Sequence, residues 1–211
     1  MLHIETVERN SMALLKKLME LKGLQDFILV GGTALSLKYG HRKSIDIDLF
    51  SQTPFDNQEL KNFLSNTFDN FLSTSSNAAP GVFAYFDEIK VDFVKYHHFK
   101  NIRPLEIVDG IRFVSSEDIA AMKIFAILQR AKKKDFWDLS LLLDMYGVQK
   151  IADYYFEKFP KNQTLITVPQ ALLYFEGAED DNEPMSLKGQ TWKSVKDNIR
   201  KHVFNFLNYK K

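Results

Sequence analysis

The sequence of 211 residues contains no cysteine. Disulfide bonds and thiolate metal sites are therefore excluded, and this composition suits a cytoplasmic protein. No stretch approaches the roughly 18 uninterrupted apolar residues of a membrane-spanning helix, so we expect no membrane segment. Residues 1–8 include two glutamates and no long apolar run, so we also expect no signal peptide.

An excess of charge of either sign is also lacking. Lysine and arginine together number 28, aspartate and glutamate 27, and the net charge is +1. No bulk basic field indicates nucleic-acid binding, so any such binding must use local patches. Hydrophobic residues make up 45% of the chain, which at this length suits one domain or two small ones with a real core.

An apolar run over 27–30 leads directly into Gly31 and Gly32. The pattern predicts a short strand, a glycine turn and a short helix over 34–39, which Gly40 ends in the left-handed conformation. Two adjacent glycines let a backbone approach a ligand closely, and the start of a helix offers unpaired N–H groups to phosphate. We therefore expect a phosphate site at this turn.

Asp46 and Asp48 alternate with apolar residues just after that helix. On a strand both aspartates project from one face, while Ile45, Ile47 and Leu49 project from the other. Their Cα atoms would lie about 6.6–6.8 Å apart, so both carboxylates can converge on one metal ion or a pair. Oxygen ligands that leave room for phosphates suit Mg²⁺. The alternatives are two solvated aspartates, or the Asp-x-Asp of metal-dependent glycosyltransferases.

The glycine pair followed by Asp46-Ile47-Asp48 resembles the signature of the polymerase-beta-like nucleotidyltransferase superfamily. Within it, residues 31–35 and 40–50 are similar to the AbiEii-type toxin nucleotidyltransferases. The resemblance implies a nucleotidyltransferase domain followed by a helical C-terminal domain. Members of that family serve as the toxin in toxin–antitoxin and phage-defence systems.

Asp92 lies alone among apolar residues in a second predicted strand, where it shares a face with Lys90 and Val94. The resemblance implies a third carboxylate on a neighbouring strand, which completes the metal site and draws the proton from the attacking hydroxyl. Asp92 matches that position. Asp87 and Glu88 fall where a turn is expected, and the alternative for Asp92 is a charge on an edge strand.

Lys123 and Arg130 are seven residues apart, about two turns along one helix, and Asp135 and Asp138 follow. The resemblance implies that the lysine reaches the nucleotide phosphates and that the basic–Asp-x-x-Asp segment forms or supports the site. The alternative is an ordinary solvated helix face. Arg42 is expected to contact either phosphate or one of the strand aspartates.

The predicted fold class is α+β: a mixed sheet with flanking helices over 1–114, followed by a helical domain over 115–211. Asp56 and Ser116 are the expected N-caps of two helices. Strands are expected at 27–30, around Asp46 and Asp48, and at 82–86, 89–96, 105–108 and 111–114. Helices are expected at 6–21, from 56, and at 117–130, 135–146, 149–158, 169–175 and 190–207. Residues 73–81 read as a loop.

The resemblance implies a Mg²⁺-dependent enzyme that moves a nucleoside monophosphate from a nucleoside triphosphate to an acceptor hydroxyl. Asp46, Asp48 and Asp92 would hold two Mg²⁺ ions. The nucleotide would be bound by Gly31, Gly32, Thr33, Lys123, Arg130, Asp135 and Asp138. The expected acceptor is tRNA, and a cognate antitoxin is an expected partner. The alternatives are a transferase acting on a small molecule or protein, and a non-catalytic binding module that keeps the fold.

Overall fold

The computed structural model describes residues 1–162 and 164–209, and the chain divides into two compact units. Unit 1 comprises Met1–Tyr39, Ser44–Lys100 and Leu105–Val114. Unit 2 comprises Gly40–Lys43, Asn101–Pro104 and Ser115–Lys211. Two short segments of unit 2 are thus flanked on both sides, in sequence, by residues of unit 1.

Unit 1 is built on a mixed sheet, which in the described part of the chain has seven strands in the order β3-β4-β5-β2-β1-β7-β6. The pairs β2–β5 and β1–β7 are parallel and the others antiparallel. The strands are β1 Phe27–Leu29, β2 Ile47–Ser51, β3 Phe71–Ser73, β4 Gly81–Phe86, β5 Ile89–Lys95, β6 Glu106–Val108 and β7 Ile111–Phe113. The mixed sheet confirms the predicted fold class.

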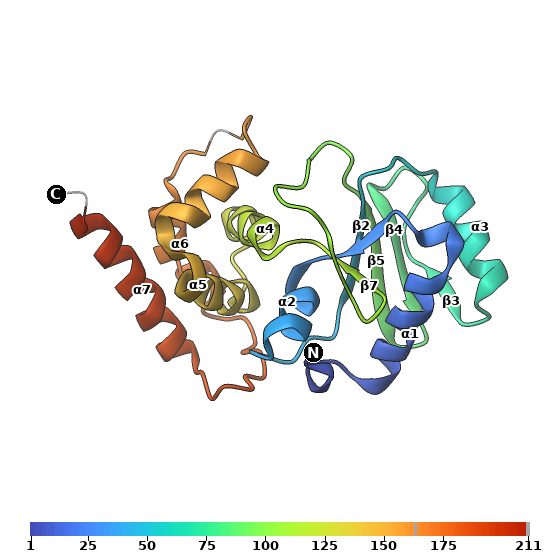
Figure 1. Cartoon of the computed structure of the whole chain (residues 1–211), viewed down its shortest axis with the longest axis horizontal. Helices are drawn as coiled ribbons and strands as arrows, with labels where there is room; N and C mark the ends of the chain where they lie inside the picture. The colour runs from blue at the N-terminus through green and yellow to red at the C-terminus, as the bar shows by residue number, and fades with distance from the viewer. Residues whose placement is uncertain (163, 210–211) are drawn as a thin grey trace. The chain divides into compact units, whose positions relative to one another are not determined.

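One face of this sheet forms the core of unit 1 and is covered by α1 and α3 (Figure 1). Leu49 of β2 lies between Leu29 of β1 and Phe93 of β5 in the register, and all three are buried. Phe93 meets Phe27 edge to face with ring centroids 5.3 Å apart. The helices of unit 1 are α1 Arg9–Glu20, α2 Gly31–Tyr39 and α3 Asn57–Thr67, with 3-10 turns η1 Ile4–Thr6 and η2 Lys22–Leu24.

Unit 2 is helical, and its core is rich in aromatic side chains. Trp137 of α5 stacks on Trp192 of α7 with centroids 5.9 Å apart, and Phe136 and Phe175 pack against Trp192. Gly147, at φ 71°, interrupts α5 where the sequence predicted a break between two helices. The elements are α4 Ser116–Gln129, α5 Lys133–Lys158, α6 Val168–Leu173, η3 Glu176–Ala178 and α7 Trp192–Tyr209.

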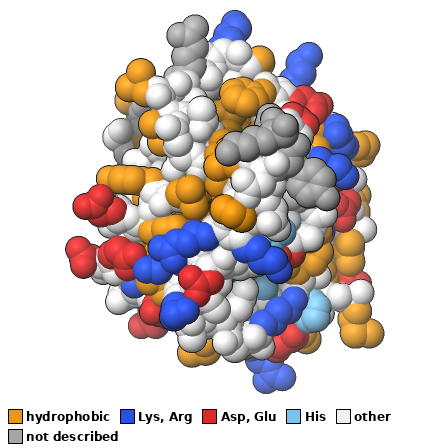
Figure 2. Space-filling model, turned by 90° about the vertical axis from the view of Figure 1, so that its left-hand side faces the viewer, with side chains coloured by type: hydrophobic (Ala, Val, Ile, Leu, Met, Phe, Trp, Pro, Cys, Tyr) orange, Lys and Arg blue, Asp and Glu red, His pale blue; other side chains and the backbone are white. Residues whose placement is uncertain are grey.

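Figure 2 shows hydrophobic side chains gathered on the face of unit 2 that α6 and α7 form. A largely apolar groove there is lined by Leu173, Phe175, Arg200, Val203, Phe204 and Leu207. Over residues 1–162 and 164–209, no helix combines the length and the apolar character needed to cross a bilayer.

Three local expectations were wrong. Helix α2 begins at Gly31 itself instead of after a glycine turn. Ser115, not Ser116, caps α4, because Ser115 keeps an extended backbone while its hydroxyl accepts the Asp118 N–H. Strand β3 was not expected, since three residues are too few for alternation to be visible. The cap at Asp56 is confirmed, because its carboxylate accepts the N–H groups of Gln58 and Glu59.

Candidate active site

Asp48 and Asp92 lie side by side on the adjacent parallel strands β2 and β5. Ile47 and Val91, which precede them, are also paired and are buried on the core face. Because strand side chains alternate, the two aspartates project from the opposite face, where both are half-buried. Asp46 immediately precedes β2. The strand register therefore places Asp48 beside Asp92, whereas Asp46, which was expected on the same strand, lies just outside it.

The start of α2 lies against Asp48. The Val30 N–H donates to the Asp48 carbonyl at 3.0 Å. Gly31 has φ +71°, and a Cβ built on it would lie 3.0 Å from Oδ2 of Asp48. Both conformation and space therefore favour glycine at this position. Gly32, the second residue of the helix, is buried.

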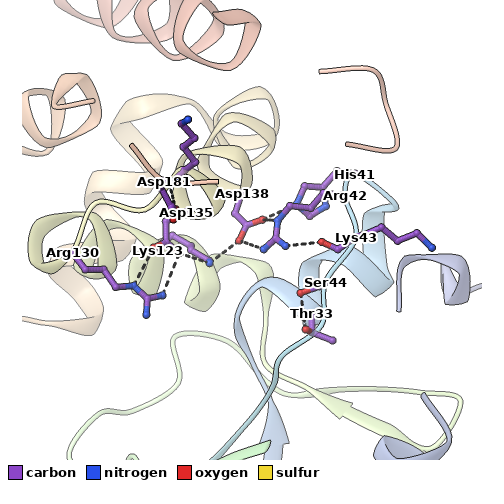
Figure 3. Close-up of polar contacts among 11 residues, drawn as sticks. Thr33, His41, Arg42, Lys43, Ser44, Lys123, Arg130, Asp135, Asp138 and Asp181 are labelled. Atoms are coloured by element: carbon purple, nitrogen blue, oxygen red, sulfur yellow. Dashed lines mark hydrogen bonds and ion pairs between the residues drawn. The ribbon is translucent and has the colours of Figure 1, made fainter. Parts of the chain in front are cut away.

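Thr33 is fixed by hydrogen bonds within unit 1. Its hydroxyl donates to the backbone carbonyl of Asp46 and lies 2.8 Å from the Ser44 hydroxyl (Figure 3). The Thr33 side chain is 1% exposed. The Thr33 side chain therefore positions the backbone at Asp46 and is not free to bind phosphate. In the sequence hypothesis, phosphate would then be bound by the N–H groups at the start of α2.

Lys90 is a member of the site that the sequence hypothesis did not include. Its ammonium lies 2.7 Å from Oδ2 of Asp92. Burial would lower the pKa of Lys90, but the hydrogen bond and charge of Asp92, together with the charges of Asp46 and Asp48, outweigh it and raise the pKa. Lys90 is therefore a cation in the field of the three aspartates. Its shared face with Asp92 was readable from the sequence, but the ion pair was not.

The fit of this site to a divalent ion rests on Asp92. Its second oxygen, Oδ1, is buried and has no hydrogen-bond partner among the residues that the structure describes. Among those same residues, no three Asp, Glu, His or Cys side chains already lie close enough to hold a metal ion. An unpaired carboxylate oxygen beside a second carboxylate on the neighbouring strand suits a hard cation such as Mg²⁺. The donor set fits the metal, although the carboxylates are not yet gathered around one point.

A second cluster of charged groups lies wholly within unit 2 and centres on Asp138 (Figure 3). The Asp138 carboxylate is fully buried and lies 2.7 Å from His41 Nε2. Arg42 donates to it through Nε at 2.7 Å and Nη2 at 2.9 Å, and the ammonium of Lys123 lies at 2.6 Å. Burial alone would raise the pKa of Asp138, but these cations and hydrogen bonds hold it well below its usual range.

Asp135 belongs to the same cluster through Lys123. The ammonium of Lys123 lies 2.7 Å from Oδ1 of Asp135, and Arg130 donates to Oδ2 at 3.2 Å. Burial by itself would lower the pKa of Lys123. The negative charges of Asp135 and Asp138 outweigh burial, so the pKa of Lys123 is raised. Lys123 is 6% exposed, so the alternative of an ordinary solvated helix face is wrong for this residue. The structure thus joins all four predicted residues of this stretch in one ion network, in which Lys123, Asp135 and Asp138 are buried and the Arg130 side chain is 53% exposed.

His41 and Arg42 enter this network from Gly40–Lys43, the segment that leads to Asp46. Arg42 takes Asp138 as its partner, a choice that no sequence pattern indicated because the two are 96 residues apart. The segment is also held by Lys43 N–H to Met185 carbonyl at 2.8 Å and Leu187 N–H to His41 carbonyl at 3.0 Å. Contacts within unit 2 therefore fix the backbone of His41 and Lys43.

The other inserted segment, Asn101–Pro104, is anchored by a second buried aspartate. Asp118 accepts the backbone N–H groups of Ile102 at 2.9 Å and Arg103 at 3.2 Å. The carboxylate also lies 2.6 Å from the ammonium of Lys158 and accepts the Ser115 hydroxyl at 2.6 Å. A buried, multiply bonded carboxylate thus holds each segment of unit 2 that is flanked by unit 1.

Comparisons with known proteins identify the family of this chain. A sequence profile described as nucleotidyl transferase AbiEii toxin, type IV toxin–antitoxin system, matches residues 13–203. An uncharacterized protein of Aquifex aeolicus is 32% identical over 202 residues, which are 92% of this chain and 94% of that protein.

Two solved structures share the fold. MenT4, a nucleotidyltransferase toxin of Mycobacterium tuberculosis, has a TM-score of 0.59 and 13% identity, covering 92% of this chain and 81% of its own. A candidate nucleotidyltransferase of Helicobacter pylori has a TM-score of 0.55 and 17% identity, covering 93% and 91%. At these identities the likeness is one of fold.

Proposed function

This chain belongs to the AbiEii family of nucleotidyltransferase toxins, and we propose that it moves a nucleoside monophosphate from a nucleoside triphosphate to an acceptor hydroxyl in a reaction that requires Mg²⁺. The observation that carries the proposal is the pairing of Asp48 with Asp92 on adjacent parallel strands, beside the first residue of α2. Carboxylates suit a divalent metal ion, and the N–H groups at the start of a helix suit phosphate, so the two together suit a metal-bound triphosphate.

Each residue of the proposed site has a distinct role. Asp46, Asp48 and Asp92 would hold the metal ions, which when bound would stabilise the attacking and leaving oxygens. Asp92 would also take up the proton of the attacking hydroxyl, and pyrophosphate would leave as the bond between the α- and β-phosphates breaks. The N–H groups at the start of α2, from Gly31 to Thr33, would bind phosphate oxygens.

Lys123, Arg130, Asp135 and Asp138 would act indirectly, through the ion network within unit 2. Asp138 holds Arg42 and His41, and so fixes the segment that leads into the first aspartate. Contact between Lys123 and the triphosphate stays a prediction. It requires the ammonium to leave two buried carboxylates, at 2.7 and 2.6 Å.

We further propose that the acceptor is tRNA, that the protein arrests growth, and that an antitoxin counteracts it. The support is the toxin–antitoxin description of the family and the name of MenT4 as a toxin. The net charge of +1 supplies no strong general attraction to RNA, so the tRNA would be recognised by a local surface.

The proposal is tested by incubating the protein with each α-labelled nucleoside triphosphate, Mg²⁺ and total RNA. Label is expected in the tRNA fraction with the wild type and not with Asp48→Asn. The matched control is Asp109→Asn, the same chemical change at an exposed turn of unit 1 with φ 51°, which asparagine tolerates. It should leave transfer intact.

The destination of the label separates the alternatives. Label in protein or in a small molecule would replace tRNA as the acceptor, and no label with any acceptor would favour a non-catalytic module. Expression in cells adds an independent test, because growth arrest should follow the wild type and Asp109→Asn but not Asp48→Asn.

A further inference from the structure

The ion pair between Lys90 and Asp92 lies inside the proposed metal site. The two residues are two apart on β5, so they share the face that also carries Asp48 on β2. The Lys90 side chain is 42% exposed, whereas that of Asp92 is 17% exposed. The pair is therefore open to solvent on the side of the lysine and shielded on the side of the aspartate.

The pair of Lys90 and Asp92 differs from an ordinary surface ion pair in two ways: one oxygen of Asp92 has no partner in the part of the chain that the structure describes, and other carboxylates act on Lys90. The lysine satisfies Oδ2 of Asp92 only, and Oδ1 stays buried without a partner among the described residues. A shielded, unpaired oxygen costs free energy unless another group binds it. Asp46 and Asp48 also act on the ammonium of Lys90 through their charges. The ammonium of Lys90 is thus paired directly with Asp92 and lies in the field of Asp46 and Asp48. We name Asp46, Asp48 and Asp92 the aspartate cluster.

We propose that Lys90 is an internal counter-ion of the aspartate cluster, and that a divalent ion binds there by displacing the ammonium from Asp92. The inference rests on the proposed function, because it takes these aspartates as the metal ligands. Lysine has a flexible four-carbon stem and a strongly hydrated ammonium, so a partly exposed lysine can move its charge into water. Lys90 thereby reduces the repulsion within the cluster and lowers its affinity for a metal ion.

Lys90→Met tests this directly, because it removes the charge and keeps a stem of similar length. Without the competing cation, Mn²⁺ should bind about tenfold more tightly, as expected for one partly shielded charge–charge contact. The matched control is Lys95→Met on the same strand. The ammonium of Lys95 lies 5.3 Å from the centre of the Phe55 ring. Its removal changes the net charge equally, but screening should limit the effect to less than about twofold.

The readout is the binding of Mn²⁺ alone, followed by the paramagnetic resonance signal of the free ion at about neutral pH and about 0.15 M salt. Thermal melting confirms that each variant is folded. The double variant Lys90→Met with Asp48→Asn should lose the gain in affinity, because Asp48 is one of the proposed ligands. No nucleotide is added, so the result does not depend on catalysis.

The outcomes separate this inference from the proposed function. If the wild type binds Mn²⁺ and Lys90→Met binds it no more tightly, Lys90 is not a competitor and only this inference fails. If neither protein binds Mn²⁺, the metal-dependent reaction and the role of Lys90 fail together. A gain that survives Asp48→Asn would place the ion elsewhere and also overturn the inference.

Discussion

Replacing Asp138 by asparagine should strongly destabilise the protein. The carboxylate of Asp138 is fully buried and accepts from Arg42 and Lys123 at 2.6–2.9 Å, with His41 at 2.7 Å. Asparagine has nearly the same shape, but its amide turns two N–H donors toward groups that are themselves donors. Arg42 then keeps a buried charge without its carboxylate partner.

The magnitude follows from the burial of the pair. Removing one partner of a buried ion pair costs about 3–5 kcal/mol, because the other charge stays desolvated. For a chain of this size, each kcal/mol lowers the melting temperature by about 2–4 °C, so a drop of roughly 6–20 °C is expected. The total stability of such proteins is about 5–15 kcal/mol, so this loss is a large share of it.

The assay is thermal melting followed by circular dichroism at neutral pH. The matched control is Asp144→Asn on the same helix, whose side chain is 56% exposed and bonds to His202 at 2.8 Å. An exposed pair contributes about 0–1 kcal/mol, so this variant should melt close to the wild type. In a double-mutant cycle, Arg42→Met should cost less in the Asp138→Asn background than in the wild type. Equal melting of the Asp138 and Asp144 variants would refute the argument that a buried network holds unit 2.

Three further predictions concern pH, the glycine at the start of α2, and the metal. Because the pKa of Asp138 is held below 3.8, its stabilisation is present above that pH and is lost as the pH falls below it; melting curves of the wild type and Asp138→Asn should therefore converge under acid conditions. Gly31→Ala and Gly110→Ala should each lose about 1–2 kcal/mol of stability in melting experiments, because both glycines have positive φ. Only Gly31→Ala should also reduce transfer, since its Cβ would lie 3.0 Å from Oδ2 of Asp48, whereas nothing lies within 4 Å at Gly110. Calorimetry should detect nucleotide binding with Mg²⁺ and much weaker binding without it, because the aspartate cluster repels a triphosphate; equal affinity in both conditions would contradict a metal-dependent site.

Local patterns in the sequence were enough to find most of the elements and the strand aspartates. Alternation around Asp92 and the spacing of Asp46 and Asp48 are period-two signals, which depend only on neighbours in the chain. The break at Gly147 and the cap at Asp56 are equally local, because each follows from the conformation or hydrogen bonding of one residue. The fold class was predicted because strand and helix signals alternate over the first part of the chain, and only helix signals follow from near residue 115.

Tertiary structure decided which charged groups are partners. Asp138 and Arg42 are 96 residues apart, and nothing in either neighbourhood specifies the other. The register of β2 on β5, which sets Asp48 beside Asp92, is fixed by which side chains can be buried together on the core face. The burial of Lys123 and the placement of Lys90 on Asp92 likewise depend on what surrounds each side chain in space. The sequence by itself determined which residues could do chemistry. Packing determined which of these residues hold the protein together. The reason is that the cost of burying a charge depends on the groups around it in space and not on its neighbours in the chain.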